Sequence, residues 1–288
     1  MRRHGKRTPF TGRVFPARRA IWSVGLASAA LIVAVAASPT AVGAERLAVR
    51  LAAVVKSLPR KAPVVPPTLL HGQFYNGTPA VGALFTTSAG HLGRHFCTGS
   101  VVASPAGDLV ITAAHCMQGK QAGSVAFVPE YHRSQQPFGG WTVTQVFVDR
   151  AWASSRSPDN DFAFLVVSQS GDATPIQDLT GGEKLGTGWK PVQKVQVIGY
   201  PDTRERPITC TSKTRAFGAH QLEFDCGGYT NGTSGGPFLA DVHAATGLGT
   251  VIGVIGGYEQ GGDTPSVSYS ARFGRAVRAL YNKAVARN

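Results

Sequence analysis

The sequence predicts an all-β protein built in two halves and ended by a C-terminal helix. Three observations lead to this prediction. About a dozen short apolar segments follow one another from residue 78 onward, turn-forming residues separate them, and no helical periodicity interrupts them before residue 273. Strands at such short spacing are typical of antiparallel barrels or sandwiches, and they argue against alternating strand–helix units.

The length and composition are those of a globular protein. The chain has 288 residues, of which 43% are hydrophobic and 16% charged, with 35 glycines and 18 prolines. These values exclude a disordered chain, a collagen, a coiled coil and a multi-span transporter. Of the net charge of +13, +7 lies within residues 1–44, and from residue 69 onward 17 basic residues face 15 acidic ones. A body so close to neutral offers no stripe for a polyanion, so we expect no nucleic-acid partner.

The first 77 residues carry export and linking signals. A basic head precedes an apolar run at residues 20–37, and small residues follow at 42–44. This layout predicts a signal peptide over residues 1–44 and secretion, by the general or the twin-arginine route. If the apolar run is not removed, it would anchor the protein in a membrane instead. Residues 45–77 are amphipathic and then rich in proline, which is typical of a pro-segment or a linker.

The expected strands fall into two groups of six. The first half (78–168) and the second half (189–270) are joined by a polar, glycine-rich connection (169–188). Apolar residues at 273, 277, 280, 281 and 284 share one helical face, which predicts a helix within residues 271–288. The expected strands cover 81–85, 99–103, 109–112, 124–128, 142–148 and 162–167, and then 192–198, 208–212, 221–224, 237–239, 251–255 and 267–270.

Four cysteines in an exported chain allow disulfides in three possible pairings. The local pairs, Cys97 with Cys116 and Cys210 with Cys226, are favoured because each pair brackets a strand, a turn and a returning strand. A zinc site at His115 and the cysteines would lack the C-x-x-C spacing of such sites. We therefore expect no metal.

Three short motifs carry residues with catalytic chemistry. They contain His115 (residues 112–116), Asp161 (159–165) and Ser234 (232–237). A serine hydroxyl is a weak nucleophile, so acyl transfer needs an imidazole to accept its proton and a carboxylate to orient that imidazole. The glycines around the serine allow a tight turn in which the N–H groups of Gly232 and Ser234 stabilise an oxyanion.

With these motifs, residues 78–280 resemble the chymotrypsin/trypsin-like serine peptidases, and in particular their secreted bacterial branch. The order His, Asp, Ser is the one found in that fold. The resemblance implies two antiparallel six-stranded β-barrels with a C-terminal helix, and a serine endopeptidase that acts on protein or peptide substrates through an acyl-enzyme, without a cofactor. It also supports the Cys97–Cys116 disulfide. The stretches that carry it are residues 97–102, 111–116, 161–164, 232–237 and 253–257.

The family pattern also decides between two aspartates. Asp161 is expected to be the catalytic one, rather than Asp159, because the apolar strand that follows the family's catalytic acid begins directly after it. Asp159 lies two residues earlier in a turn that contains proline.

The chain departs from the family pattern at three positions. Thr233 stands where the animal enzymes carry an aspartate, so an ion pair with a newly freed amino terminus is not available. Activation by removal of residues 45 to about 70 is the alternative hypothesis. Gly228 replaces the acid of the trypsin-type pocket, and Ile255 stands where glutamate-specific bacterial relatives carry histidine. We therefore expect an uncharged substrate side chain before the scissile bond. The expected pocket residues are Gly228, Thr230, Gly256 and Gly257.

The alternative to an enzyme is a catalytically silent relative that uses the same body as a binding module. A lipase or esterase of the α/β-hydrolase fold is disfavoured, because the chain has no G-x-S-x-G elbow between a strand and a helix and its triad order differs. The sequence leaves the oligomeric state open.

Overall fold

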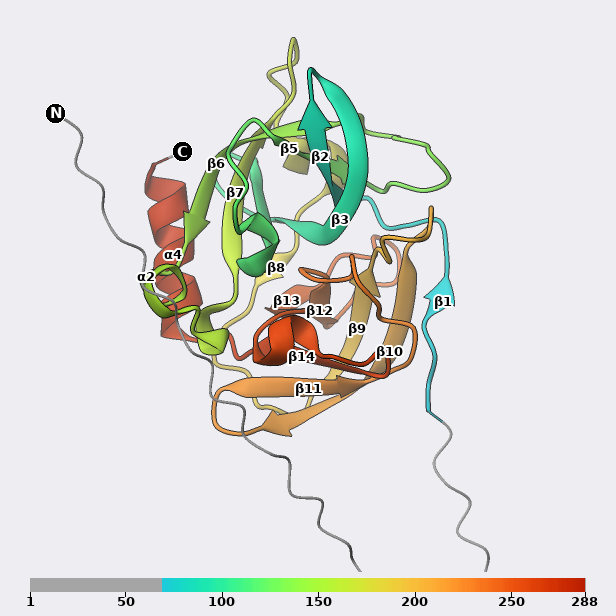
Figure 1. The fold of residues 1–288 in the computed structure, drawn as a ribbon, viewed down its shortest axis with the longest axis vertical. Coiled ribbons are helices and arrows are strands. Elements are labelled where there is room, and N and C mark those ends of the chain that lie inside the picture. Colours follow the sequence, from blue (N-terminus) through green and yellow to red (C-terminus); the bar gives the residue numbers. More distant parts are fainter. Residues whose placement is uncertain (1–68, 288) are drawn as a thin grey trace, which may run out of the picture. The chain divides into compact units, whose positions relative to one another are not determined.

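Two β-sheets dominate residues 69–287, the part of the chain that the computed structural model describes (Figure 1). The first sheet comes from the first half of the sequence and, β1 apart, the second sheet comes from the second half. The predicted all-β fold in two halves is thereby confirmed. The predicted signal peptide and residues 45–68 of the predicted pro-segment or linker lie outside the described residues.

The first sheet closes into a six-stranded barrel. Its strand order is β2-β3-β4-β7-β6-β5, and β5 pairs with β2 to complete the ring. All six pairings are antiparallel, as expected for strands joined by short connections. The strands are β2 (Val81–Ser88), β3 (His91–Val102), β4 (Leu109–Thr112), β5 (Val125–Pro129), β6 (Trp141–Val148) and β7 (Ala163–Ser168).

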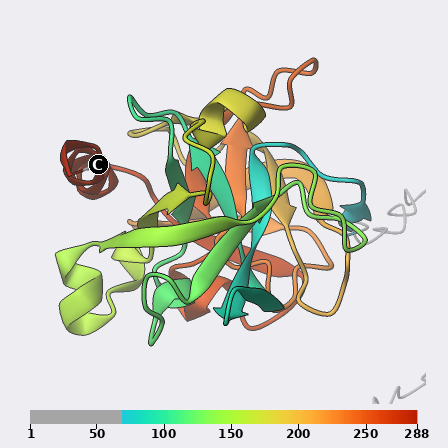
Figure 2. The same ribbon diagram turned by 90° about the horizontal axis from the view of Figure 1, so that it is seen from above.

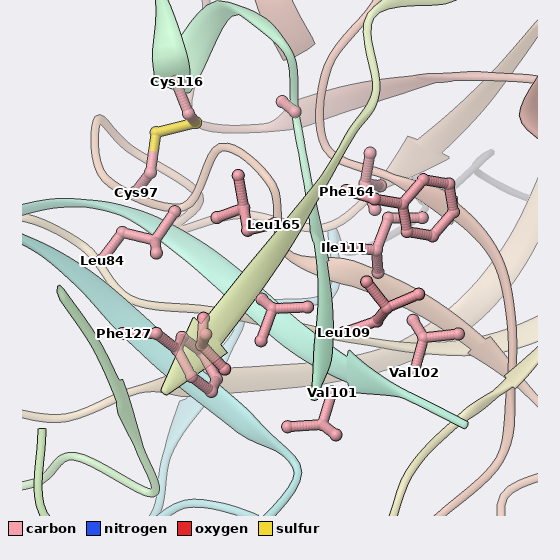
Figure 3. Packing of buried hydrophobic residues seen from close by; sticks show 14 of the residues in the cluster. Leu84, Cys97, Val101, Val102, Leu109, Ile111, Cys116, Phe127, Phe164 and Leu165 are labelled. Carbon is pink, nitrogen blue, oxygen red and sulfur yellow. A yellow bond between two sulfur atoms is a disulfide. The ribbon is translucent and has the colours of Figure 1, made fainter. Parts of the chain in front are cut away.

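The barrel is filled by apolar side chains from its strands. Leu84, Val101, Ile111, Phe127 and Leu165 come from five different strands and have no solvent exposure (Figure 3). Full burial of such a side chain contributes about 1.5–3 kcal/mol. This core therefore stabilises the barrel from which the loops of the first half of the chain emerge.

The second sheet is an open path of strands rather than a ring closed by backbone pairing. Its order is β14-β11-β10-β9-β12-β13-β8, with β1 paired to β10. At the junction of β13 and β14 the N–H of Val254 donates to Oγ of Ser270 at 2.9 Å. The strands are β1 (Gln73–Phe74), β8 (Lys184–Leu185), β9 (Lys194–Gly199), β10 (Ile208–Phe217), β11 (Gln221–Asp225), β12 (Pro237–Ala240), β13 (Thr250–Val254) and β14 (Val267–Ala271).

Residues 69–77, the end of the predicted pro-segment or linker, run along this second sheet. The N–H of Gly227 donates to the carbonyl of Leu70 at 2.7 Å, and the N–H of Gly72 donates to the carbonyl of Gly227 at 2.8 Å. This part of the chain is therefore bonded to the folded body.

The C-terminal helix follows the second sheet in sequence but packs against the first barrel. Val277, Leu280 and Ala284 are buried, and the hydroxyl of Tyr281 donates to the carbonyl of Ala103 at 2.8 Å. Figure 2, which looks at the molecule from above, shows this helix at the outer edge. No helix in residues 69–287 is long and apolar enough to cross a membrane. The helices are α2 (Arg150–Ser155), α3 (Ile176–Thr180) and α4 (Arg275–Ala286).

Candidate active site

His115 lies where the chain leaves β4. It is the first residue of η1 (His115–Met117), a single 3₁₀ turn. Its side chain is 10% exposed, and its Nδ1 lies 2.7 Å from Oδ2 of Asp161. The main-chain N–H of His115 donates to the other carboxylate oxygen of Asp161 at 2.8 Å. Two bonds to one carboxylate fix both the ring and the backbone of this histidine.

Asp161 follows η2 (Pro158–Asn160), and one residue, Phe162, separates it from the start of β7. Its side chain is fully buried and accepts a third hydrogen bond from the N–H of Gly257 at 2.9 Å. Because a carboxylate accepts and does not donate, Nδ1 of His115 is the donor in this bond, and the neutral ring then has its lone pair on Nε2. Asp159 instead accepts a bond from Gln221 at 2.6 Å. Of the two aspartates, only Asp161 reaches the imidazole.

Ser234 lies in the turn that precedes β12. Its main-chain carbonyl accepts a bond from the N–H of Thr98 on β3 at 2.7 Å, which ties this turn of the second half to the first barrel. Ser234 and His115 line the same cleft, one from each half of the chain. Among the described residues, no hydrogen bond joins Oγ of Ser234 to His115. Such bonds are often long before a substrate is bound.

The N–H groups of Gly232 and Ser234 have no acceptor within residues 69–287, and both residues line the cleft. Gly232 has a φ of +90°, and a Cβ there would lie 2.4 Å from the main-chain nitrogen of Asp202. Only glycine fits such a position. Unpaired N–H groups in a cleft are the type of donor that can bind a developing oxyanion.

The cleft has a volume of about 810 Å³. Of the four expected pocket residues, Thr230 lines it, and the three glycines lie outside its lining. Gly256 is in contact with Asp161, whose Oδ2 would lie 3.0 Å from a Cβ at this position, and Gly228 lies beside His71. Sequence reasoning missed Ser268, which is 1% exposed and lines the cleft. No local sequence signal distinguishes this serine from others in strands.

The four cysteines form the two expected local disulfides. Cys97–Cys116 spans 19 residues and Cys210–Cys226 spans 16. The first disulfide, drawn in Figure 3, closes a loop of the sequence that contains His115. His115 Nδ1 or Nε2 and the two sulfurs of that disulfide lie within 4.8 Å of one another, but metal ligation by cysteine needs a free thiolate. These sulfurs are bonded to each other and cannot serve as ligands.

A sequence model of the family described as "Trypsin-like peptidase domain" matches residues 97–254, which is more than half of the chain. The chain belongs to this family. The match begins at Cys97 and ends with β13, so it includes His115, Asp161 and Ser234. The family resemblance inferred from the motifs is thereby confirmed.

Among curated proteins, this family member is similar to "Trypsin Blo t 3" from Blomia tropicalis. The two are 28% identical over 191 residues, which cover 56% of this chain and 66% of the relative. The chain thus matches slightly less than two thirds of the length of that trypsin.

Three solved structures resemble the fold of this family member. Protease Anisep from Arthrobacter nicotinovorans has 24% identity and a TM-score of 0.63, covering 75% of this chain and 99% of that one. The thermostable serine protease AL20 from an extremophilic microorganism has 24% identity and a TM-score of 0.62, covering 73% and 99%. A Glu endopeptidase has 15% identity and a TM-score of 0.58, covering 75% and 97%. The chymotrypsin-like fold implied by the sequence is confirmed.

Proposed function

We propose that this protein is a secreted serine endopeptidase that cleaves peptide bonds through an acyl-enzyme. One observation carries the proposal: the fully buried carboxylate of Asp161 is bonded to Nδ1 of His115, and His115 lines the same cleft as Ser234. A buried carboxylate that orients an imidazole toward a serine is the arrangement that activates a hydroxyl for acyl transfer.

In the acylation step, Oγ of Ser234 attacks the scissile carbonyl while Nε2 of His115 takes the hydroxyl proton. Asp161 keeps the ring in the required tautomer and stabilises the imidazolium that forms. The N–H groups of Gly232 and Ser234 donate to the oxyanion of the tetrahedral intermediate. His115 then gives the proton to the leaving amine, which departs and leaves an ester on Ser234.

In the deacylation step, a water takes the place of the leaving amine. His115 removes a proton from this water, the hydroxide attacks the ester, and the proton returns to Oγ of Ser234 as the acid product leaves. The same chemistry hydrolyses activated esters, so we expect an esterase side activity.

Two observations support secretion. Residues 1–44 have the layout of a signal peptide, and the body contains two disulfides, which form and persist in oxidising compartments. The substrates are proteins or peptides. Ile255 and Thr230 line the cleft and are uncharged, which supports an uncharged side chain before the scissile bond.

The test is covalent labelling with a fluorophosphonate probe, located by peptide mass spectrometry. We expect the wild-type protein to be modified at Ser234 and to hydrolyse casein. Ser234→Ala should lose both labelling and hydrolysis, because it lacks the nucleophile, and His115→Ala should lose them by a factor of about 10³ or more. Ser154→Ala, which removes an exposed hydroxyl at the end of α2, is the matched control and should keep both.

The opposite result would support the alternative function. A folded wild-type protein that takes up no probe at Ser234 and cleaves no peptide would be a binding module built on a peptidase body. Labelling that persists in Ser234→Ala would place the nucleophile elsewhere.

A further inference from the structure

Thr233, directly before Ser234, is bound into a tight turn. Its N–H donates to the carbonyl of Thr230 at 3.1 Å, and its side-chain hydroxyl donates to the same carbonyl at 2.7 Å. Thr233 is 3% exposed. The third residue of this four-residue turn is Gly232, with a φ of +90°, as a type II turn requires. The turn is thus closed twice, once by the backbone and once by the threonine side chain.

The two peptide groups that carry the N–H of Gly232 and the N–H of Ser234 are also fixed through their carbonyls. The carbonyl of Asn231 accepts a bond from the N–H of Asp202 at 2.8 Å, and the carbonyl of Thr233 accepts one from the N–H of Gly236 at 2.9 Å. In a planar trans peptide the N–H points opposite to the C=O. These two bonds therefore set the directions of the N–H groups of Gly232 and Ser234.

Gly232 and Thr233 lie between these two peptide groups. The carbonyl of Gly232 accepts a bond from the hydroxyl of Thr98 at 3.0 Å, and Thr233 is restrained by its own hydroxyl bond to the carbonyl of Thr230. Rotation about its φ or ψ would turn one N–H away from the other. Its Cβ also packs closely on Gly199, where an added Cβ would lie 2.7 Å away. The side chain is therefore held by a hydrogen bond on one side and by van der Waals contact on the other.

We propose that Thr233 is a positioning residue that holds the N–H groups of Gly232 and Ser234 in their oxyanion-binding orientation, through the hydrogen bond from its hydroxyl to the carbonyl of Thr230. The proposal rests on the proposed function, because it concerns the same turn. In the animal enzymes that the chain resembles, an aspartate paired with the amino terminus stands at this position. Here a neutral hydrogen bond within the turn takes over that task. The turn is then assembled without a charged partner.

The test compares Thr233→Val with Thr233→Ser. Valine keeps the shape of threonine and removes the hydroxyl, whereas serine keeps the hydroxyl and removes the methyl group. We expect the second-order rate of Ser234 modification by a fluorophosphonate to fall on the order of 10- to 100-fold in Thr233→Val, since misdirected donors stabilise the oxyanion less. Thr233→Ser should stay within about threefold of the wild type.

Thr180→Val is the matched control. Thr180 is also buried, and its hydroxyl donates to carbonyls at 3.0 and 2.8 Å, but it lies on α3 and outside the cleft. This variant should lose thermal stability comparably to Thr233→Val and keep the wild-type labelling rate. On substrates, the Thr233→Val loss should appear in kcat rather than in KM, because the bond acts on the transition state.

Several outcomes would overturn the proposal. A folded Thr233→Val that is labelled at the wild-type rate would do so, as would an equal loss of rate in Thr180→Val. If Thr233→Val does not fold, Thr233→Ser decides: a loss beyond 10-fold would mean that the methyl contact, and not the hydroxyl, is required. A wild-type protein that is not labelled at all would refute the proposed function instead.

Discussion

At the scale of single residues, Glu183 is an acid in an apolar setting. It has no solvent exposure, one carboxyl oxygen accepts a bond from the N–H of Gly249, and the other, Oε1, has no partner among residues 69–287. Burial raises the pKa of this carboxyl from 4.5 to about 8. The folded protein therefore holds a proton that the unfolded chain releases between these two values.

The sign of the resulting pH dependence follows from that difference. Between about pH 4.5 and pH 8, Glu183 ionises in the unfolded chain but stays protonated in the folded protein, so its contribution to the free energy of unfolding falls as the pH rises. Above about pH 8 it is ionised in both states, and the effect levels off. Glu183→Gln stays neutral at every pH. Its stability relative to the wild type should rise by up to about 4 kcal/mol between pH 4.5 and pH 8.5. Urea unfolding at a series of pH values measures this difference.

Asp172→Asn gives a control of opposite sign. Asp172 is exposed, and the hydrogen bond from the N–H of Thr174 lowers its pKa. Its contribution to stability is present at neutral pH and lost as the pH falls toward the range of acidic carboxyls. The wild type should therefore gain on this variant only as the pH rises through the acidic range below about 4, and the difference between them should be flat from pH 4.5 to pH 8.5. A Glu183→Gln difference that is flat with pH would show that Glu183 is ionised in the folded protein.

At the scale of elements, the two disulfides close loops of nearly equal length and differ in what those loops carry. By loop length, each should stabilise the fold by about 3 kcal/mol. Cys97 and Cys116 line the cleft, and Cys116 follows His115 in the chain. Cys210 and Cys226 belong to the apolar core of the second half. Loss of the first disulfide should therefore lower both stability and activity, whereas loss of the second should lower stability alone.

We expect the double variants Cys97→Ala/Cys116→Ala and Cys210→Ala/Cys226→Ala to lose similar stability, about 2–4 kcal/mol each. At a temperature where both are folded, the first should lose about 10-fold or more in kcat/KM, because a displaced imidazole acts poorly as a base. The second should stay within about threefold of the wild type. Chemical unfolding and ester hydrolysis measure the two effects. Equal losses of activity in both variants would contradict the separation.

The elements also show how far the sequence could predict the fold. Each of the twelve expected strands has a counterpart, and α4 lies where the apolar stripe indicated, because alternating or helical periodicity extends over enough residues to be read. Apart from the 3₁₀ turns, four short strands and α-helices were missed: β1 and β8 have two residues each, and α2 and α3 have six and five. α2 depends on a single cap, in which Asp149 accepts a bond from the N–H of Ala151. Elements this short owe their form to tertiary contacts.

At the scale of the whole molecule, the candidate site divides into residues that carry their own sequence signal and residues that do not. His115, Asp161 and Ser234 each lie in a local motif, so their identity and order could be predicted from the sequence. Thr98 reaches the serine turn from β3, and Gly257 reaches Asp161 from a position 96 residues away in the chain. Only the packing of the second half on the first barrel brings these groups together.

The charge of the molecule is also unevenly distributed. From residue 69 onward the chain has only two more basic than acidic residues, yet three carboxylates line the cleft: Asp202, Glu259 and Asp263. None of the three forms an ion pair in the described part of the chain. The single lysine in the lining, Lys120, lies 4.2 Å from the centre of the Phe96 ring. Such a cleft should attract substrates with cationic residues flanking the uncharged side chain that is expected before the scissile bond.

Replacing two of these carboxylates tests the effect of that field on substrate choice. In Glu259→Gln/Asp263→Asn, we compare a peptide with flanking lysines and a peptide with flanking glutamates, of equal length and with the same uncharged residue before the scissile bond. We expect the ratio of their kcat/KM values to fall about 3- to 10-fold, since each exposed pair contributes less than about 1 kcal/mol. In the wild type the ratio should shrink as salt is raised, because exposed charges are screened. Asp172→Asn/Asp241→Asn changes the net charge equally at exposed sites outside the cleft. If this control lowered the ratio as much, the preference would come from net charge and not from the cleft.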